Sequence, residues 1–140
     1  MDNNSKSLNI KEKLRQALNS TAKVISDDFQ NKEDLDKNKS SKKFDFFDLD
    51  NLNSKNDFLK ARAYSDSSAL KRKFSNLEIY KKNLPLNSSC KSLYSIAEKI
   101  RYESLGGKML KGIKKNLKDN YNQIISLKRK DQLKSKEDVS

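Results

Sequence analysis

Carboxylates and arginines are the side chains whose types and spacing could support chemistry in this chain. They fall in two segments, with Asp66 and Arg72 in the first and Glu98, Arg101 and Glu103 in the second. Asp66 lies on an apolar stripe at helical spacing, where burying an unpaired charge is costly. Arg101 is its expected partner, and Arg72 is expected to face Glu98 or Glu103. We therefore predict structural ion pairs that orient two helices; a catalytic carboxylate pair is the alternative.

The chain lacks residues that metal binding and nucleotide binding require. The run at 65–68 resembles an Asp-x-Ser-x-Ser metal loop, but Leu70 stands where a further oxygen ligand is needed, and the run lies within a predicted helix. The Gly-Gly-Lys run at 106–108 lacks the earlier glycine and the upstream strand of a phosphate loop. The chain has no His and a single Cys, Cys90, which removes the commonest general base and any cysteine-based zinc cluster. We predict no catalytic residue and no metal site.

Composition and charge limit the class of protein to which this chain can belong. Hydrophobic residues make up 34% of the 140 residues, whereas globular proteins usually contain about 45–50%. The net charge of +12 suggests nucleic acid or an anionic membrane as a partner. However, the positive charge is mostly Lys scattered over every segment, so nucleic acid is the less favoured interpretation. Because no signal peptide and no membrane-spanning run is present, we expect a cytoplasmic protein without a membrane partner.

Apolar periodicity divides the chain into four stretches. Residues 8–26 are predicted as a first helix and residues 27–56 as a polar, disordered linker. Residues 57–127 are predicted as a helical core, and residues 128–140 as a charged tail that frays. The expected fold is mainly α, a small bundle of three to four helices.

Three helices are expected within the core stretch. Asp57 is the predicted N-cap of the first, and Pro85 is expected to stop it because proline pushes the preceding residue out of the α region. The glycine pair at 106–107 is expected to close the next helix with a positive-φ residue, and Gly112 to permit a close helix contact or a bend. Short connections favour an antiparallel unit. Its shared core is predicted to contain Leu70, Phe74, Ile96, Ile100, Ile113 and Leu117.

An apolar segment at 44–49 interrupts the polar linker. Phe44, Phe46 and Phe47 stand there among aspartates. The segment is interpreted either as a short strand, whose period of two breaks at the adjacent phenylalanines, or as a strap lying on the helical core. A third hypothesis is that the three phenylalanines dock on a partner protein.

The predicted core helices resemble the N-terminal region of the CobT family, the large subunit of aerobic cobaltochelatase. That region has a helix with an Asp followed by Ala-Leu and basic residues, then a Pro, then a helix of the form Leu/Ala-Glu-x-x-Arg-x-Glu-Ala-Leu-Gly, and then Gly-Val-x-x-Asn-Leu. The matching residues are Asp66, Ala69, Leu70, Lys71, Lys73, Pro85, Glu98, Arg101, Glu103, Leu105, Gly106, Gly112, Ile113, Asn116 and Leu117. The resemblance covers most of residues 10–125.

The resemblance implies a role in cobalamin biosynthesis. Members of the family work with an AAA+ ATPase subunit in a complex that uses ATP and magnesium to insert cobalt into a corrin ring, a ligase reaction that forms a cobalt–nitrogen complex. They also carry a C-terminal von Willebrand A domain, which is expected to be missing here because the chain ends at Ser140. We therefore expect a truncated, inactive relative that binds no cofactor itself and acts as a non-catalytic adaptor to the AAA+ subunit. A decayed remnant without activity and a small basic nucleic-acid-binding protein are the alternatives.

Overall fold

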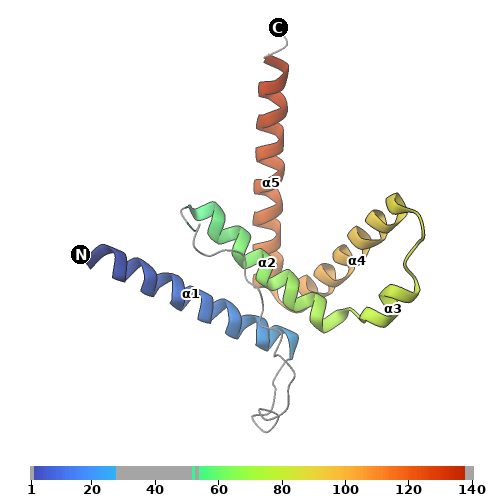
Figure 1. The fold of residues 1–140 in the computed structure, drawn as a ribbon, viewed down its shortest axis with the longest axis horizontal. Coiled ribbons are helices and arrows are strands. Elements are labelled where there is room, and N and C mark those ends of the chain that lie inside the picture. The colour runs from blue at the N-terminus through green and yellow to red at the C-terminus, as the bar shows by residue number, and fades with distance from the viewer. Residues whose placement is uncertain (1, 28–51, 53, 138–140) are drawn as a thin grey trace.

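Five helices make up the part of the chain that the computed structural model describes, which is residues 2–27, 52 and 54–137. They are α1 (Asp2–Ser26), α2 (Lys55–Phe74), α3 (Leu77–Lys82), α4 (Ser88–Met109) and α5 (Lys111–Glu137) (Figure 1). The prediction of a mainly α protein is confirmed. The apolar segment at 44–49, with Phe44, Phe46 and Phe47, lies outside the described residues.

Helix α2 is the element on which the other long helices pack. Helices α1, α4 and α5 each contact α2, and α4 also contacts α5. Figure 1 shows α2 crossing the middle of the molecule, while the C-terminal part of α5 extends away from the other helices. Seven of the ten residues of α2 from Ala61 to Leu70 are buried, and five of these seven are Ala or Ser. This is the composition expected of a helix with neighbours on more than one side, because small side chains allow close approach.

The apolar core joins four of the five helices. It contains Ala22, Ile25, Ala63, Ala69, Leu70, Tyr102, Ile113 and Leu117, with Phe74 packed against it. The predicted core positions Leu70, Ile113 and Leu117 are therefore confirmed, and Phe74 lies at the edge of the core. The prediction for Ile96 and Ile100 is wrong, because these side chains are 56% and 59% exposed. Only the C-terminal part of α4 has buried residues, and its N-terminal half diverges from α2 (Figure 1).

The first helix packs on α2 through its C-terminal half. Leu18, Ala22 and Ile25 are buried there, and the Ser65 hydroxyl donates a hydrogen bond to the Leu18 carbonyl oxygen at 3.4 Å. Where α1 ends, the ammonium of Lys73 pairs with the carboxylate of Asp27. These contacts make α1 part of the same core as the helices that follow it.

The second predicted helix is shorter than expected because an asparagine begins a new one. Helix α2 ends at Phe74, and Ser75 is its C-cap. The side-chain oxygen of Asn76 accepts hydrogen bonds from the backbone N–H groups of Glu78 and Ile79 at 2.9 and 3.1 Å, which caps the short α3. Side chains of this type compete with helix continuation by bonding to nearby backbone groups. Pro85 consequently follows α3 and does not end α2.

Four other helix ends also differ from the predictions. Helix α1 begins at Asp2 and not at residue 8. Ser54 is the N-cap of α2, and Asp57 is the third residue of the helix; the two residues form a capping box, since they exchange hydrogen bonds. Helix α4 runs through the glycine pair at 106–107 to Met109, and neither glycine has a positive φ. Helix α5 continues to Glu137, beyond the predicted core boundary at 127 and into the predicted tail.

Gly106 brings α4 close to α2. A β-carbon at this position would lie 2.2 Å from Cδ2 of Leu70, whose side chain is completely buried. At the neighbouring Gly107, the nearest atom to a β-carbon is Cβ of Lys114 at 3.5 Å, an ordinary contact. Gly112 has no atom within 4 Å of a β-carbon and therefore makes no close helix contact of the predicted kind.

The first prediction compares the two adjacent glycines of α4. Gly106→Ala should lower the free energy of unfolding by about 1–3 kcal/mol, because the added methyl group overpacks the site against Leu70. Gly107→Ala is the matched control and should raise it by up to about 1 kcal/mol through helix propensity. Denaturant unfolding followed by circular dichroism measures both. Equal effects of the two substitutions would contradict the close packing of α4 on α2.

The second prediction separates buried from exposed apolar side chains. Leu70→Ala should cost about 2–5 kcal/mol of the free energy of unfolding, since it leaves a cavity in the core. Ile96→Ala should change it by no more than about 0.5 kcal/mol, as is usual for surface substitutions. Thermal and denaturant unfolding of both variants provide the measurement. A thermal shift within error for Leu70→Ala would remove Leu70 from the core.

Candidate functional site at the junction of α2, α4 and α5

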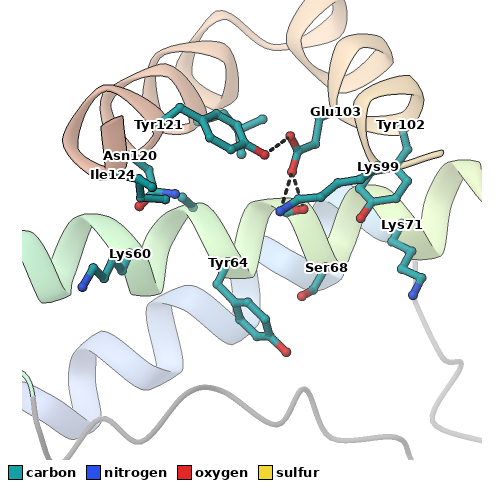
Figure 2. Close-up of a pocket in the computed structure, with 13 residues that line it drawn as sticks. Lys60, Tyr64, Ser68, Lys71, Lys99, Tyr102, Glu103, Asn120, Tyr121 and Ile124 are labelled. Carbon is teal, nitrogen blue, oxygen red and sulfur yellow. Dashed lines mark hydrogen bonds and ion pairs between the residues drawn. The ribbon is translucent and has the colours of Figure 1, made fainter. Parts of the chain in front are cut away.

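The carboxylate of Glu103 on α4 is the centre of a buried polar cluster. The Ser67 hydroxyl on α2 donates a hydrogen bond to Oε1 at 2.6 Å, and the Tyr121 hydroxyl on α5 donates one to Oε2 at 2.7 Å. The ammonium of Lys99 lies 3.9 Å from Oε1 (Figure 2). Glu103 is only 8% exposed, so these donors replace the water that its carboxylate would otherwise bind.

Helical periodicity explains how the sequence positions these groups. Lys99 and Glu103 are four residues apart on α4, so their side chains lie on the same face of the helix. Tyr121 follows the buried Leu117 by one turn of α5. Ser67 is one of the small buried residues of α2, and its short side chain leaves room for the longer Glu103.

The environment of Tyr121 keeps its hydroxyl a hydrogen-bond donor. Burial raises the pKa of Tyr121, and the hydrogen bond to Glu103 and the charge of that carboxylate raise it further. The ammonium of Lys99 also lies 5.7 Å from the centre of the Tyr121 ring, within the range of a cation–π interaction. The cluster therefore holds three helices together with both carboxylate oxygens already accepting hydrogen bonds.

A groove of about 390 Å³ lies beside this cluster. Lys60, Tyr64 and Lys71 of α2 line it together with Asn120 and Tyr121 of α5, and Figure 2 shows these side chains. The side-chain oxygen of Asn120 is buried without a hydrogen-bond partner among the described residues. The lysine side chains of the lining carry positive charge, and its hydroxyl groups can donate hydrogen bonds, so the groove suits a polar or anionic group.

Asp66 is buried on α2 but does not pair with Arg101. Its carboxylate accepts a hydrogen bond from Nδ2 of Asn116 on α5 at 2.8 Å. Burial raises the pKa of Asp66, against the opposing effects of the Asn116 hydrogen bond and the charge of Arg62. The predicted Asp66–Arg101 ion pair is therefore wrong; an amide meets the need of the buried carboxylate for a donor.

Arg101 instead joins α4 to the end of α2. Its guanidinium binds Glu98 within α4 at 2.7 and 2.8 Å and donates to the Phe74 carbonyl oxygen at 2.6 Å. The Ser75 hydroxyl donates to Glu98 at 2.6 Å. The last carbonyls of a helix lack partners within the helix, so Arg101 satisfies one of them. The pairing of the exposed Arg72 with Glu98 or Glu103 stays a prediction.

Two further properties of the described residues bear on function. Among these residues, no three His, Cys, Asp or Glu side chains converge in a way that could hold a metal ion. None of the helices in the described part of the chain combines the length and the apolar character needed to cross a membrane.

Residues missed by the sequence analysis supply most of the donors. Ser67, Asn116 and Tyr121 each donate to a carboxylate that was expected to need an arginine. The signal for Tyr121 was available, since it lies one turn after Leu117 on the apolar stripe of α5. No comparable signal marks Ser67, because a serine in a helix interior does not by itself indicate a distant acidic partner.

The fold and the site define a helical protein organised around one buried carboxylate that joins three helices. The family model for cobalamin biosynthesis protein CobT matches residues 9–140, and the chain belongs to this family. The resemblance seen in the sequence is thereby confirmed, and with it involvement in cobalamin biosynthesis. No curated protein and no solved structure matched the chain.

The residues that carried the resemblance have packing roles in the structure. Many of them lie where α2, α4 and α5 meet. They include Asp66, Leu70, Glu98, Arg101, Glu103, Gly106, Asn116 and Leu117. The pattern therefore describes a helix junction, in which each of these acidic side chains has a specific donor and Gly106 allows the close approach of α4 to Leu70.

The third prediction tests the hydrogen bond between α4 and α5. Tyr121→Phe should lower the free energy of unfolding by about 1.5–3 kcal/mol, the usual effect of losing a hydrogen bond to a charged acceptor. In a double-mutant cycle with Glu103→Gln, the coupling energy should exceed about 0.5 kcal/mol. Denaturant unfolding of the four proteins measures this coupling. A value of zero would show that the two side chains do not interact.

The fourth prediction concerns acid stability. The hydrogen bond from Arg101, aided by the one from Ser75 and by nearby positive charge, overcomes partial desolvation and lowers the pKa of Glu98 from 4.5 to about 2. The resulting stabilisation is fully present above the unfolded pKa and is lost as the pH falls from about 5 towards 2. Glu98→Gln should therefore reduce the loss of stability over that range. Parallel pH profiles of the wild type and the variant would contradict this assignment.

Proposed function

We propose that this protein is a non-catalytic adaptor that binds the AAA+ ATPase subunit of cobaltochelatase during ATP-dependent insertion of cobalt into a corrin ring. The observation that supports the proposal is the match of residues 9–140 to the CobT family. The structure adds a helical scaffold with large apolar side chains exposed on it, including several on α4. Exposed apolar side chains that lie next to one another are typical of surfaces that bind another protein.

In this proposal the chemistry is divided between subunits. The ATPase subunit binds ATP and magnesium, while cobalt and the corrin ring are substrates of the complex. The role of this chain is to bind the ATPase subunit and to keep a fixed shape while doing so. The hydrogen-bonded junction around Glu103 supports that role, because it holds α2, α4 and α5 in one arrangement.

The fifth prediction is that this protein associates with the cognate ATPase subunit. The two should elute together from a size-exclusion column at micromolar concentrations, and the association should depend less steeply on salt than nucleic-acid binding does, because apolar surface makes most of the contact. Binding to nucleic acid, by contrast, would weaken linearly in the logarithm of the salt concentration. The docking hypothesis for Phe46 and Phe47 is tested in parallel by changing both to Ser.

Three outcomes would contradict the adaptor function. Failure of the folded protein to associate with the ATPase subunit at micromolar concentrations would favour an inactive remnant. Tight binding to nucleic acid with a steep salt dependence would favour the basic-protein alternative. Insertion of cobalt by the isolated chain with ATP would contradict all three interpretations.

A further inference from the structure

Helix α4 carries an apolar stripe that no described helix covers. Leu93, Ile96 and Ile100 are spaced by three and four residues, so they line one face of the helix. Their exposed fractions are 67%, 56% and 59%. The buried Glu103 follows Ile100 by three residues and therefore lies on the same side of α4. The stripe is exposed because the N-terminal half of α4 diverges from α2.

The stripe continues into a groove between α4 and α5. This groove has a volume of about 460 Å³, and Ile100 lines it together with Gly107 from α4 and Leu117 and Tyr121 from α5. Because Ile100 belongs to both features, the stripe and the groove form one continuous surface. We call it the α4–α5 docking surface, made of Leu93, Ile96, Ile100, Gly107 and Tyr121, with the buried Leu117 at the base of the groove.

The charge around this surface is positive. Lys108 and Lys114 line the groove, and Glu103 is the acidic side chain that the structure shows in its lining. The carboxylate of Glu103 already accepts hydrogen bonds from Ser67 and Tyr121. An incoming group therefore meets two ammonium groups and a carboxylate whose oxygens are occupied.

We propose that the α4–α5 docking surface binds an amphipathic helix of a partner protein, with acidic residues flanking the apolar face of that helix. An apolar stripe at helical spacing beside a groove is suited to helix-in-groove recognition. The two lysines at the groove select for acidic flanks. A second copy of this chain would bring its own lysines against them, and like charges in contact are costly. The inference rests on the proposed function only for the identity of the partner.

The experiment uses a synthetic probe and the full chain. The probe is a fluorescein-labelled peptide of about 18 residues, long enough to form a helix, with leucines on one face and glutamates beside them. Fluorescence anisotropy measures its affinity for the wild type and for Ile96→Ser/Ile100→Ser. We expect the double change to weaken binding at least about tenfold, because it removes two central apolar contacts.

Matched variants control for the folded state and for general stickiness. Val24→Ser changes another apolar side chain of similar exposure, 59%, on α1 and should leave affinity unchanged. Lys108→Ala/Lys114→Ala should weaken binding of the acidic peptide and abolish its preference over a peptide with lysines in place of glutamates. Circular dichroism of each variant confirms that it is folded. Chemical-shift changes on peptide addition should map to α4 and α5.

The results that would overturn the inference are distinct from those that would overturn the adaptor function. Equal affinities of the wild type and Ile96→Ser/Ile100→Ser, or no binding of the peptide, would exclude this surface. A dimer of the free chain that the same double change dissociates would assign the surface to a second copy instead. If the peptide binds as expected while the ATPase subunit does not bind, the surface stands and the proposed function fails.

Discussion

The carboxylate of Glu103 belongs to α4, yet its hydrogen bonds come from α2 and α5. Because this carboxylate is buried, it has lost most of its contact with water and depends on these donors to replace it. Ser67 and Tyr121 can reach it only if the three helices hold one arrangement. The nearby contact of Gly106 with Leu70 has the same effect, since it allows α4 close enough for the hydrogen bond to Ser67 to form. The rest of the core is arranged around this junction.

Two additional polar contacts fix the helices around it. Asn116 on α5 donates to Asp66 on α2, and Arg101 on α4 donates to the last residue of α2. Each contact joins a different pair of helices, so together they restrict both rotation and sliding. Among the described residues, Leu70 is the largest side chain with almost no exposed surface. Specific polar contacts therefore contribute to the uniqueness of the packing alongside the modest apolar core.

The same geometry leaves apolar surface uncovered on α4. Its C-terminal part is held at the junction, while its N-terminal half diverges from α2 and exposes Leu93, Ile96 and Ile100. The chain belongs to the CobT family, and this arrangement supports the proposed adaptor role. A helix that is fixed at one end presents its exposed apolar side chains to a partner in a defined order. The site that holds the protein together and the surface proposed to bind a partner share Tyr121 and Leu117.

The sequence by itself determined that the protein is mainly helical, since apolar spacing and capping residues act within single helices. It also determined that Leu70, Ile113 and Leu117 are buried, and its residue pattern identified the family. Only the tertiary structure decided that Asp66 binds Asn116 and that Ile96 and Ile100 remain exposed. The physical reason is that helical periodicity defines which face is apolar but not which helix covers it. Partners for buried carboxylates depend likewise on how closely two helices approach, which here depends on Gly106 and the small residues of α2.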